Sequence, residues 1–180
     1  VFSGNVTLSA TGLDDFSFGV SGTVLDPSKF FVDFENQELP AGSYAEGSWK
    51  IAQRNYYSED NVYFLSNGTQ NSEDKFVTPL LRVAEGEKMT VDVARTYFNT
   101  SGDGVYLKVY YSTDRRNWTL AKNISSTEMS STRAVSYTYT FGELSTFVID
   151  NIPAGDYYIG FVAGYSCIDN IYGFQKLDVA

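Results

Sequence analysis

The stretch Gly102-Asp-Gly-Val-Tyr-Leu-Lys-Val-Tyr-Tyr-Ser-Thr-Asp-Arg-Arg-Asn-Trp-Thr-Leu120 decides the fold. Val105, Leu107 and Val109 alternate in it with more polar residues, which is the period-2 pattern of a strand buried on one face. A turn with two glycines precedes this strand, and a polar turn separates it from a second short strand at residues 118–121. The stretch therefore predicts a β-hairpin in the middle of a sheet.

Short runs of the same kind recur on both sides of this hairpin and are separated by turn signals. They lie at residues 30–35, 74–81, 88–97, 136–141, 146–149, 157–163 and 167–174, whereas residues 43–70 read as irregular and aromatic-rich. The 14 Tyr and 13 Phe residues, and the lack of a long segment with helical apolar spacing, also favour strands. About ten short strands at this spacing predict an all-β fold, a two-sheet antiparallel β-sandwich of jelly-roll type.

Residues 1–27 have a character of their own. Two short alternating runs flank a turn at residues 12–15, and Leu25-Asp-Pro-Ser28 then marks a break in the chain. A segment of this length is too short to fold alone. We expect it to be the last strands of an upstream domain, with a linker or a hairpin that pairs with the sandwich as alternatives. The sandwich itself is expected to comprise residues 28–180.

Composition and charge exclude several classes of function. The net charge of -9 argues against a nucleic-acid or anionic-membrane partner, and no apolar run is long enough for a membrane-spanning helix. The chain has no His, which removes imidazole acid–base chemistry and the triads that depend on it. It also lacks a glycine-rich phosphate loop and a serine nucleophile elbow, so we expect no enzyme activity. The single cysteine, Cys167, lies in an apolar run and is expected to be a small buried residue.

Four blocks occur in a characteristic order between residues 30 and 180. They are Val32-Asp-Phe-Glu35 with Leu39-Pro-Ala-Gly42, Asp74-Lys-Phe-Val-Thr-Pro79, the hairpin from Gly102 to Trp118, and Ile152-Pro-Ala-Gly155 continuing to Ile171. This order resembles the cleaved-adhesin and choice-of-anchor J jelly-roll domains of bacterial surface proteins, which are similar to MAM domains. Residues 1–27 are in turn similar to the final strand of the Ig-like repeats that precede such modules.

The resemblance implies a secreted or cell-surface, non-catalytic module of a larger multidomain protein, of a kind frequent in Bacteroidetes. Its partner would be a host or matrix protein or a glycan, and related jelly rolls often carry structural Ca²⁺. The alternatives are a carbohydrate-binding module of a glycan-degrading or glycan-capturing system, and a structural spacer. Two positions depart from the family pattern: Ser43-Tyr44 replaces the usual Trp, and Asp169-Asn170 replaces a closing acidic pair.

Carboxylates near the two ends of the sandwich are candidate Ca²⁺ ligands, because Ca²⁺ needs six to eight oxygen ligands. Asp33 and Glu35 share one strand face, and the first and last strands of a jelly roll commonly lie together, which would bring Asp169 or Asn170 near them. The resemblance makes Glu35 and Asp169 the leading ligands. The simpler interpretation is that the first pair is solvated and that Asp169 caps backbone amides.

A glycan site would use exposed aromatic rings beside hydrogen-bonding side chains. The candidates are Trp49, Arg54, Asn55, Tyr56, Tyr57 and Tyr165. The competing interpretation is that most of these rings fill the core or seal loops. Trp118 is expected to pack against its own hairpin rather than to bind a ligand.

Overall fold

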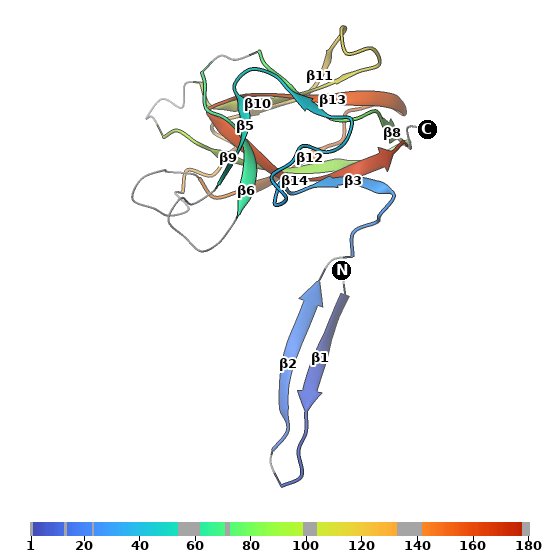
Figure 1. Cartoon of the computed structure of the whole chain (residues 1–180), viewed down its shortest axis with the longest axis vertical. Helices are drawn as coiled ribbons and strands as arrows, with labels where there is room; N and C mark the ends of the chain where they lie inside the picture. Colours follow the sequence, from blue (N-terminus) through green and yellow to red (C-terminus); the bar gives the residue numbers. More distant parts are fainter. Residues whose placement is uncertain are drawn as a thin grey trace.

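The computed structural model describes residues 2–12, 14–22, 24–53, 62–70, 73–98, 104–132 and 142–177, which form 14 strands and no helix (Figure 1). The strands are β1 (Phe2–Leu8), β2 (Phe16–Gly22), β3 (Lys29–Val32), β4 (Tyr44–Ala45), β5 (Trp49–Gln53), β6 (Tyr63–Asn67), β7 (Phe76–Val77), β8 (Leu81–Val83), β9 (Met89–Arg95), β10 (Tyr106–Ser112), β11 (Thr119–Ser125), β12 (Ser145–Ile149), β13 (Gly155–Gly164) and β14 (Ser166–Lys176). In this part of the chain, nothing helical is long and apolar enough to cross a membrane.

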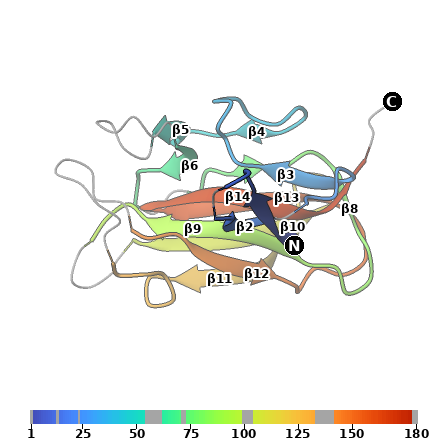
Figure 2. The ribbon, with the colours of Figure 1, turned by 90° about the horizontal axis from the view of Figure 1, so that it is seen from below.

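The strands from β3 onward form two antiparallel layers (Figure 1), and Figure 2 views the layer with β14 and β9 face on. One layer has the order β11-β10-β13-β7-β4, and the other has the order β5-β6-β14-β9-β12, with β3 beside the second half of β14. β13 joins the layers, because its start pairs with β8 and the rest of it pairs with β10. The predicted all-β, two-sheet sandwich is confirmed.

The core lies between the two layers and contains the inward face of the hairpin that decided the fold. Leu107 and Val109 are fully buried, as are Phe76 and Phe161, whose rings stack with centroids 5.9 Å apart. Burying one such side chain contributes roughly 1.5–3 kcal/mol, which is why the alternating pattern fixes the strand's orientation. Cys167 is also buried, as its apolar surroundings predicted.

Three details differ from the strand predictions. Residues 43–70, expected to be irregular, include β4, β5 and β6. The run at residues 74–81 is divided into β7 and β8, with Pro79 between them, because proline has no amide hydrogen to donate to a ladder. β3 ends at Val32, and Phe34 then turns into the core with a φ of 57°. The strand expected at residues 136–141 lies outside the described residues.

β1 and β2 form a two-stranded sheet of their own, which projects from the sandwich in Figure 1. Val6 pairs with Phe18 and Leu8 with Phe16, so these four apolar side chains share one face. That face is uncovered: Phe16 is 62% exposed and Leu8 is 58% exposed. The hairpin thus repeats the period-2 pattern of the sandwich strands without a second layer to pack on.

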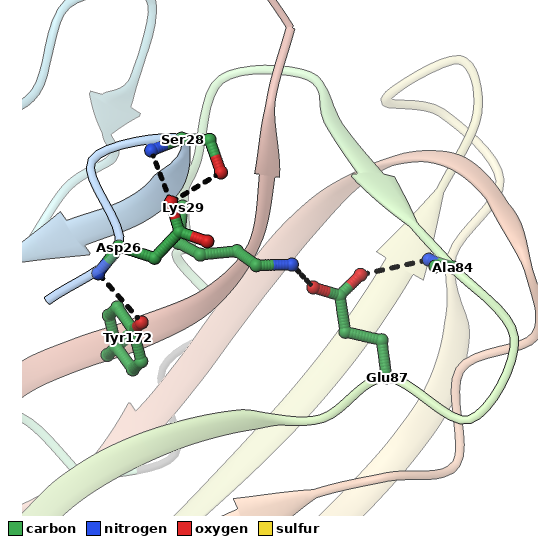
Figure 3. Close-up of polar contacts among 6 residues, drawn as sticks. All are labelled: Asp26, Ser28, Lys29, Ala84, Glu87 and Tyr172. Carbon is green, nitrogen blue, oxygen red and sulfur yellow. Dashed lines mark hydrogen bonds and ion pairs between the residues drawn. The ribbon is translucent and has the colours of Figure 1, made fainter. Parts of the chain in front are cut away.

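Polar contacts hold the chain in place where the sandwich begins, as Figure 3 shows. The Asp26 carboxylate accepts hydrogen bonds from the backbone amide and the hydroxyl of Ser28, and the Asp26 amide donates to the Tyr172 hydroxyl at 3.2 Å. Lys29 forms an ion pair with Glu87, whose other oxygen accepts the amide of Ala84. These contacts hold the start of β3 against β14, through Tyr172, and against the turn between β8 and β9, through Glu87.

Candidate functional site

The structure brings the predicted carboxylates together at the junction of β3 and β14. Val32 pairs with Ile171, so the segment that follows β3, with Asp33 and Glu35, runs beside Asp169. The negative charges of both residues act on the Asp169 carboxyl group. The expected proximity of the first and last strands of the sandwich is therefore observed.

Asp92 is a fourth acidic residue of this cluster, and the sequence reasoning missed it. Asp92 on β9 pairs directly with Asp169 on β14. The alternation in β9 placed Asp92 on the outward face, but only the pairing of β9 with β14 places it opposite another carboxylate. We call Asp33, Glu35, Asp92 and Asp169 the acidic cluster.

Asp169 is unusual in the cluster because its side chain is only 3% exposed. Burial raises its pKa to about 7, and the neighbouring charges of Glu35, Asp92 and Asp33 act in the same direction, while a hydrogen bond from the Asn170 amide opposes them. The ion pairs formed among the described residues are Lys29–Glu87, Arg82–Asp156 and Lys88–Asp150, so no Lys or Arg of the described ranges forms an ion pair with this cluster. Buried carboxylates in that situation take up either a proton or a cation.

The other carboxylates of the cluster are partly engaged by hydrogen bonds. Asp92 accepts from the Asn170 side-chain amide at 2.9 Å and from the Thr146 hydroxyl at 2.5 Å. One oxygen of Glu35 accepts the amide of Tyr63 at 3.3 Å, and one oxygen of Asp33 accepts the amide of Glu35 at 3.2 Å. Asn170 itself is exposed and has a φ of 45°, at an irregularity in the pairing of β14 with β9.

The donor set of this cluster is suited to a hard cation such as Ca²⁺, which takes carboxylate, amide and carbonyl oxygens and water. Asp169, Glu35 and Asp33 supply carboxylates, and Asn170 supplies an amide oxygen. Within the described ranges, however, no three Asp, Glu, Cys or His side chains converge closely enough to hold a metal ion. A cation here would need water or backbone oxygens to complete its coordination.

The structure describes only some of the aromatic candidates for a glycan site, and it buries Trp49. Trp49 is only 6% exposed, and its indole nitrogen donates to the Asp74 carbonyl at 3.0 Å, so it is a core residue and not an exposed sugar platform. The prediction of an irregular, aromatic-rich loop over residues 43–70 is wrong at this position, because Trp49 begins strand β5. Arg54, Asn55, Tyr56 and Tyr57 lie outside the described residues.

Tyr165 is half-buried and packs at the edge of the core, between β13 and β14. Its ring lies 4.8 Å from that of the exposed Tyr97, at an interplanar angle of 35°. The six-membered ring of Trp118 lies on Gly160 of β13, the strand beside its own hairpin, with 2.8 Å between Cζ3 and the place where a Cβ of residue 160 would lie.

Comparisons with known proteins support the fold. No protein-family model and no curated protein matches the sequence. Among solved structures, the K1 cleaved adhesin domain of Lys-gingipain from Porphyromonas gingivalis W83 is similar, with a TM-score of 0.58, 18% identity, and coverage of 83% of this chain and 99% of that domain. The K2 cleaved adhesin domain of Lys-gingipain gives a TM-score of 0.54 and 16% identity, with coverage of 84% and 100%. The C-terminal CBM6 of LamC, a marine laminarinase from Zobellia galactanivorans, gives a TM-score of 0.49 at 12% identity, with coverage of 82% and 99%. The chain therefore has the fold of a cleaved adhesin domain.

Proposed function

We propose that this chain is a non-catalytic, extracellular binding module of an exported bacterial surface protein, acting in adhesion or ligand binding. The observation that carries the proposal is the shared fold with a cleaved adhesin domain, over 99% of the length of that domain. The lack of His in the whole chain agrees with a binding role rather than a hydrolytic one. The proposed partner is a host or matrix protein or a glycan.

A binding screen tests this proposal. The chain is immobilised and presented with extracellular-matrix proteins in one arm and with a glycan array in the other. Saturable binding in either arm is the expected result. Binding in neither arm would contradict the proposal and favour the structural spacer. A carbohydrate-binding module is the second candidate, and the half-buried, partly accessible rings of Tyr106, Trp118 and Tyr158 on one sheet face favour it.

We also propose that Ca²⁺ stabilises the module through the acidic cluster. Support comes from the burial of Asp169 beside three further carboxylates whose charges oppose its ionisation. Asp169 and Glu35 would be the principal ligands, with Asp33 and Asn170 as further oxygen donors. A bound cation would offset the repulsion between these groups and keep Asp169 ionised. Isothermal titration with CaCl₂ tests the proposal, and no heat of binding from chelator-treated protein would contradict it.

Residues 1–27, we infer, belong to the sheet of another unit in a larger multidomain chain. A two-stranded sheet is at best marginally stable in water, and the face with Phe16 and Leu8 is exposed. The likeness to the K1 domain spans 99% of that domain but only 83% of this chain, so the sandwich fold accounts for less than the whole sequence. Removing residues 1–24 should leave the melting temperature of the sandwich unchanged and lower its tendency to aggregate. Loss of folding in this variant would contradict the inference.

A further inference from the structure

The outer face of the layer β11-β10-β13-β7-β4 carries aromatic rings set directly on the sheet. Tyr106 on β10 pairs with Gly164 on β13, and a Cβ at residue 164 would lie 2.6 Å from the Tyr106 ring. Trp118 rests in the same way on Gly160. Neither glycine has a positive φ, so the backbone conformation does not require glycine. Glycine is needed at these two positions because a larger side chain would occupy the space of the rings. The rings are thereby held along β13, each half-buried and in part accessible to solvent.

Three cations lie over rings of this face. The Lys108 ammonium is 5.1 Å from the centroid of the Tyr106 ring, and the Lys75 ammonium is 5.8 Å from that of Trp118. The Arg115 guanidinium is 4.0 Å from the centroid of the Tyr158 ring and 5.4 Å from that of Tyr44. Each distance is within the range of a cation–π interaction. We call Tyr106, Lys108, Trp118, Lys75, Tyr158 and Arg115 the cation–ring face.

The negative charges of Glu73 and Glu46 act on the rings of Tyr106 and Tyr44, but no carboxylate of the described residues forms an ion pair with these three cations. The ion pairs of the described residues involve Lys29, Arg82 and Lys88, and none involves a cation of the cation–ring face. A ring offers a cation a weak, non-ionic partner, so the positive charge stays available to an anion. A protein of net charge -9 thus gathers three cations without an ion pair on one sheet face of its described part.

The position of Arg115 is set by the turn between β10 and β11. Arg115 has a φ of 60°, which is uncommon for a residue with a side chain. The Asp114 carboxylate holds the turn by accepting the amides of Arg116 and Asn117, both at 2.8 Å, while the Ser112 hydroxyl accepts the amide of Arg115 at 2.9 Å. The turn therefore presents the guanidinium above Tyr158 before a ligand arrives, which reduces the ordering cost of binding.

We infer that the cation–ring face binds an anionic glycan, a polysaccharide with carboxylate or sulfate groups. The inference rests on the proposed ligand-binding function and names the ligand class and the face. The apolar face of a pyranose ring packs on an exposed aromatic ring, and its acid group accepts hydrogen bonds from a neighbouring Lys or Arg. A charged glycan presents both groups in each repeat. An acidic peptide presents the charges without the rigid apolar ring.

The test measures binding of the full chain to polygalacturonate, to dextran sulfate and to uncharged dextran at physiological salt. The test variant is Lys108→Gln with Arg115→Gln, and the matched control is Lys50→Gln with Lys88→Gln, which removes the same charge from elsewhere on the surface. The test variant should weaken binding to at least one anionic polymer by roughly tenfold, about 1.4 kcal/mol, with the melting temperature unchanged. The control should bind like the unmodified chain. The two anionic polymers distinguish a carboxylate from a sulfate ligand.

Several outcomes would overturn the inference. Equal losses of affinity in the test and control variants would mean that the polymers bind by non-specific attraction to positive charge. Binding of dextran with the same affinity as the anionic polymers would show that the acid groups of the ligand are not recognised. Polyglutamate binding as tightly as the anionic glycans, with the same loss in the test variant, would identify an acidic peptide as the ligand class. Binding of a neutral glycan or a matrix protein that is unaffected in the test variant would overturn this inference and leave the proposed function standing. Absence of every kind of binding would contradict both.

Discussion

The acidic cluster and the cation–ring face differ in the sign of their charges and in the burial of the charged groups. At the junction of β3 and β14, Asp169 is buried beside other carboxylates without a paired Lys or Arg. On the outer face of β10 and β13, Lys108 and Arg115 lie over rings without a paired carboxylate. A buried group of like charges affects stability, because its repulsion is poorly screened, whereas half-exposed cations are accessible to a ligand. We therefore expect substitutions in the acidic cluster to change stability and substitutions in the cation–ring face to change ligand binding.

The largest expected effect is the stabilisation of the fold by Ca²⁺ at the acidic cluster. At a Ca²⁺ concentration of 100 times Kd, a single site stabilises the fold by about 2.7 kcal/mol, which corresponds to a rise of roughly 5–10 °C in Tm for a chain of this size. Asp169→Asn should abolish this rise, whereas Asp156→Asn, which removes only the exposed pair with Arg82, should keep it. Differential scanning calorimetry with CaCl₂ and with chelator measures the difference. An unchanged Tm of the unmodified chain on addition of CaCl₂ would contradict the proposal that Ca²⁺ stabilises the module.

The acidic cluster should also make stability depend on pH when Ca²⁺ is chelated. The folded-state pKa of Asp169, about 7, lies above the ordinary value of 3.8, so the folded state binds this proton more tightly than the unfolded state. Stability is therefore highest below the unfolded pKa and falls as the pH rises toward 7. Urea unfolding of chelator-treated protein between pH 4 and pH 8 should show this fall, and Asp169→Asn should reduce it. A stability that is independent of pH in both proteins would contradict the buried state of Asp169.

Gly160→Ala tests whether the Trp118 ring packs on Gly160 of β13 in the cation–ring face. The new Cβ would lie 2.8 Å from the Trp118 ring, which must shift or strain the sheet. We expect a loss of about 1–3 kcal/mol in unfolding free energy, the usual range for overpacking. Gly68→Ala is the control, because a Cβ there would meet no heavy atom within 4 Å. Equal unfolding midpoints for the two variants in urea would show that the ring is not held on β13.

Asp114→Ala tests whether the turn positions Arg115, and its expected effect is the smallest. The hydrogen bonds from Asn117 and Arg116 hold the pKa of the Asp114 carboxyl well below its usual range, so its stabilisation is present above pH 3.8 and is lost only as the pH falls through the folded-state pKa. The variant should bind anionic glycan about threefold more weakly, because the arginine loses its preset position. Arg115→Lys should lose a similar amount, since it keeps the charge but not the planar stack. Unchanged glycan affinity in both variants would mean that the turn only stabilises the fold.

The fold class followed from local patterns, because alternation reports which face of a strand is buried. Val105, Leu107 and Val109 set the orientation of β10, and all three are buried between the layers. Alternation does not identify the strands within residues 43–70, because they are short and carry little alternation, and it does not predict the burial of Trp49. Its burial depends on the pairing of β5 with β6 and on the Asp74 carbonyl, both distant in sequence.

The candidate sites were predictable only in part. Glu35, Asp33 and Asp169 could be associated from the sequence, since a jelly roll places its first and last strands together. Asp92 could not be added, because no local pattern states that β9 pairs with β14. The cation–ring face was likewise hidden: Lys108 and Arg115 lie in one hairpin, but Lys75 and Tyr158 are brought beside it only by the pairing of β13 with β10 and β7.

The sequence by itself determined the strands, the inward side chains and the chemistry that the chain lacks, because period-2 alternation and composition are local or additive properties. Only the tertiary structure decided which charged groups meet. Strand pairing buried Asp169 among carboxylates, and the packing of β10 on the glycines of β13 set rings beneath cations. Such contacts join residues far apart in the chain, and their energies depend on the burial and distance that folding creates.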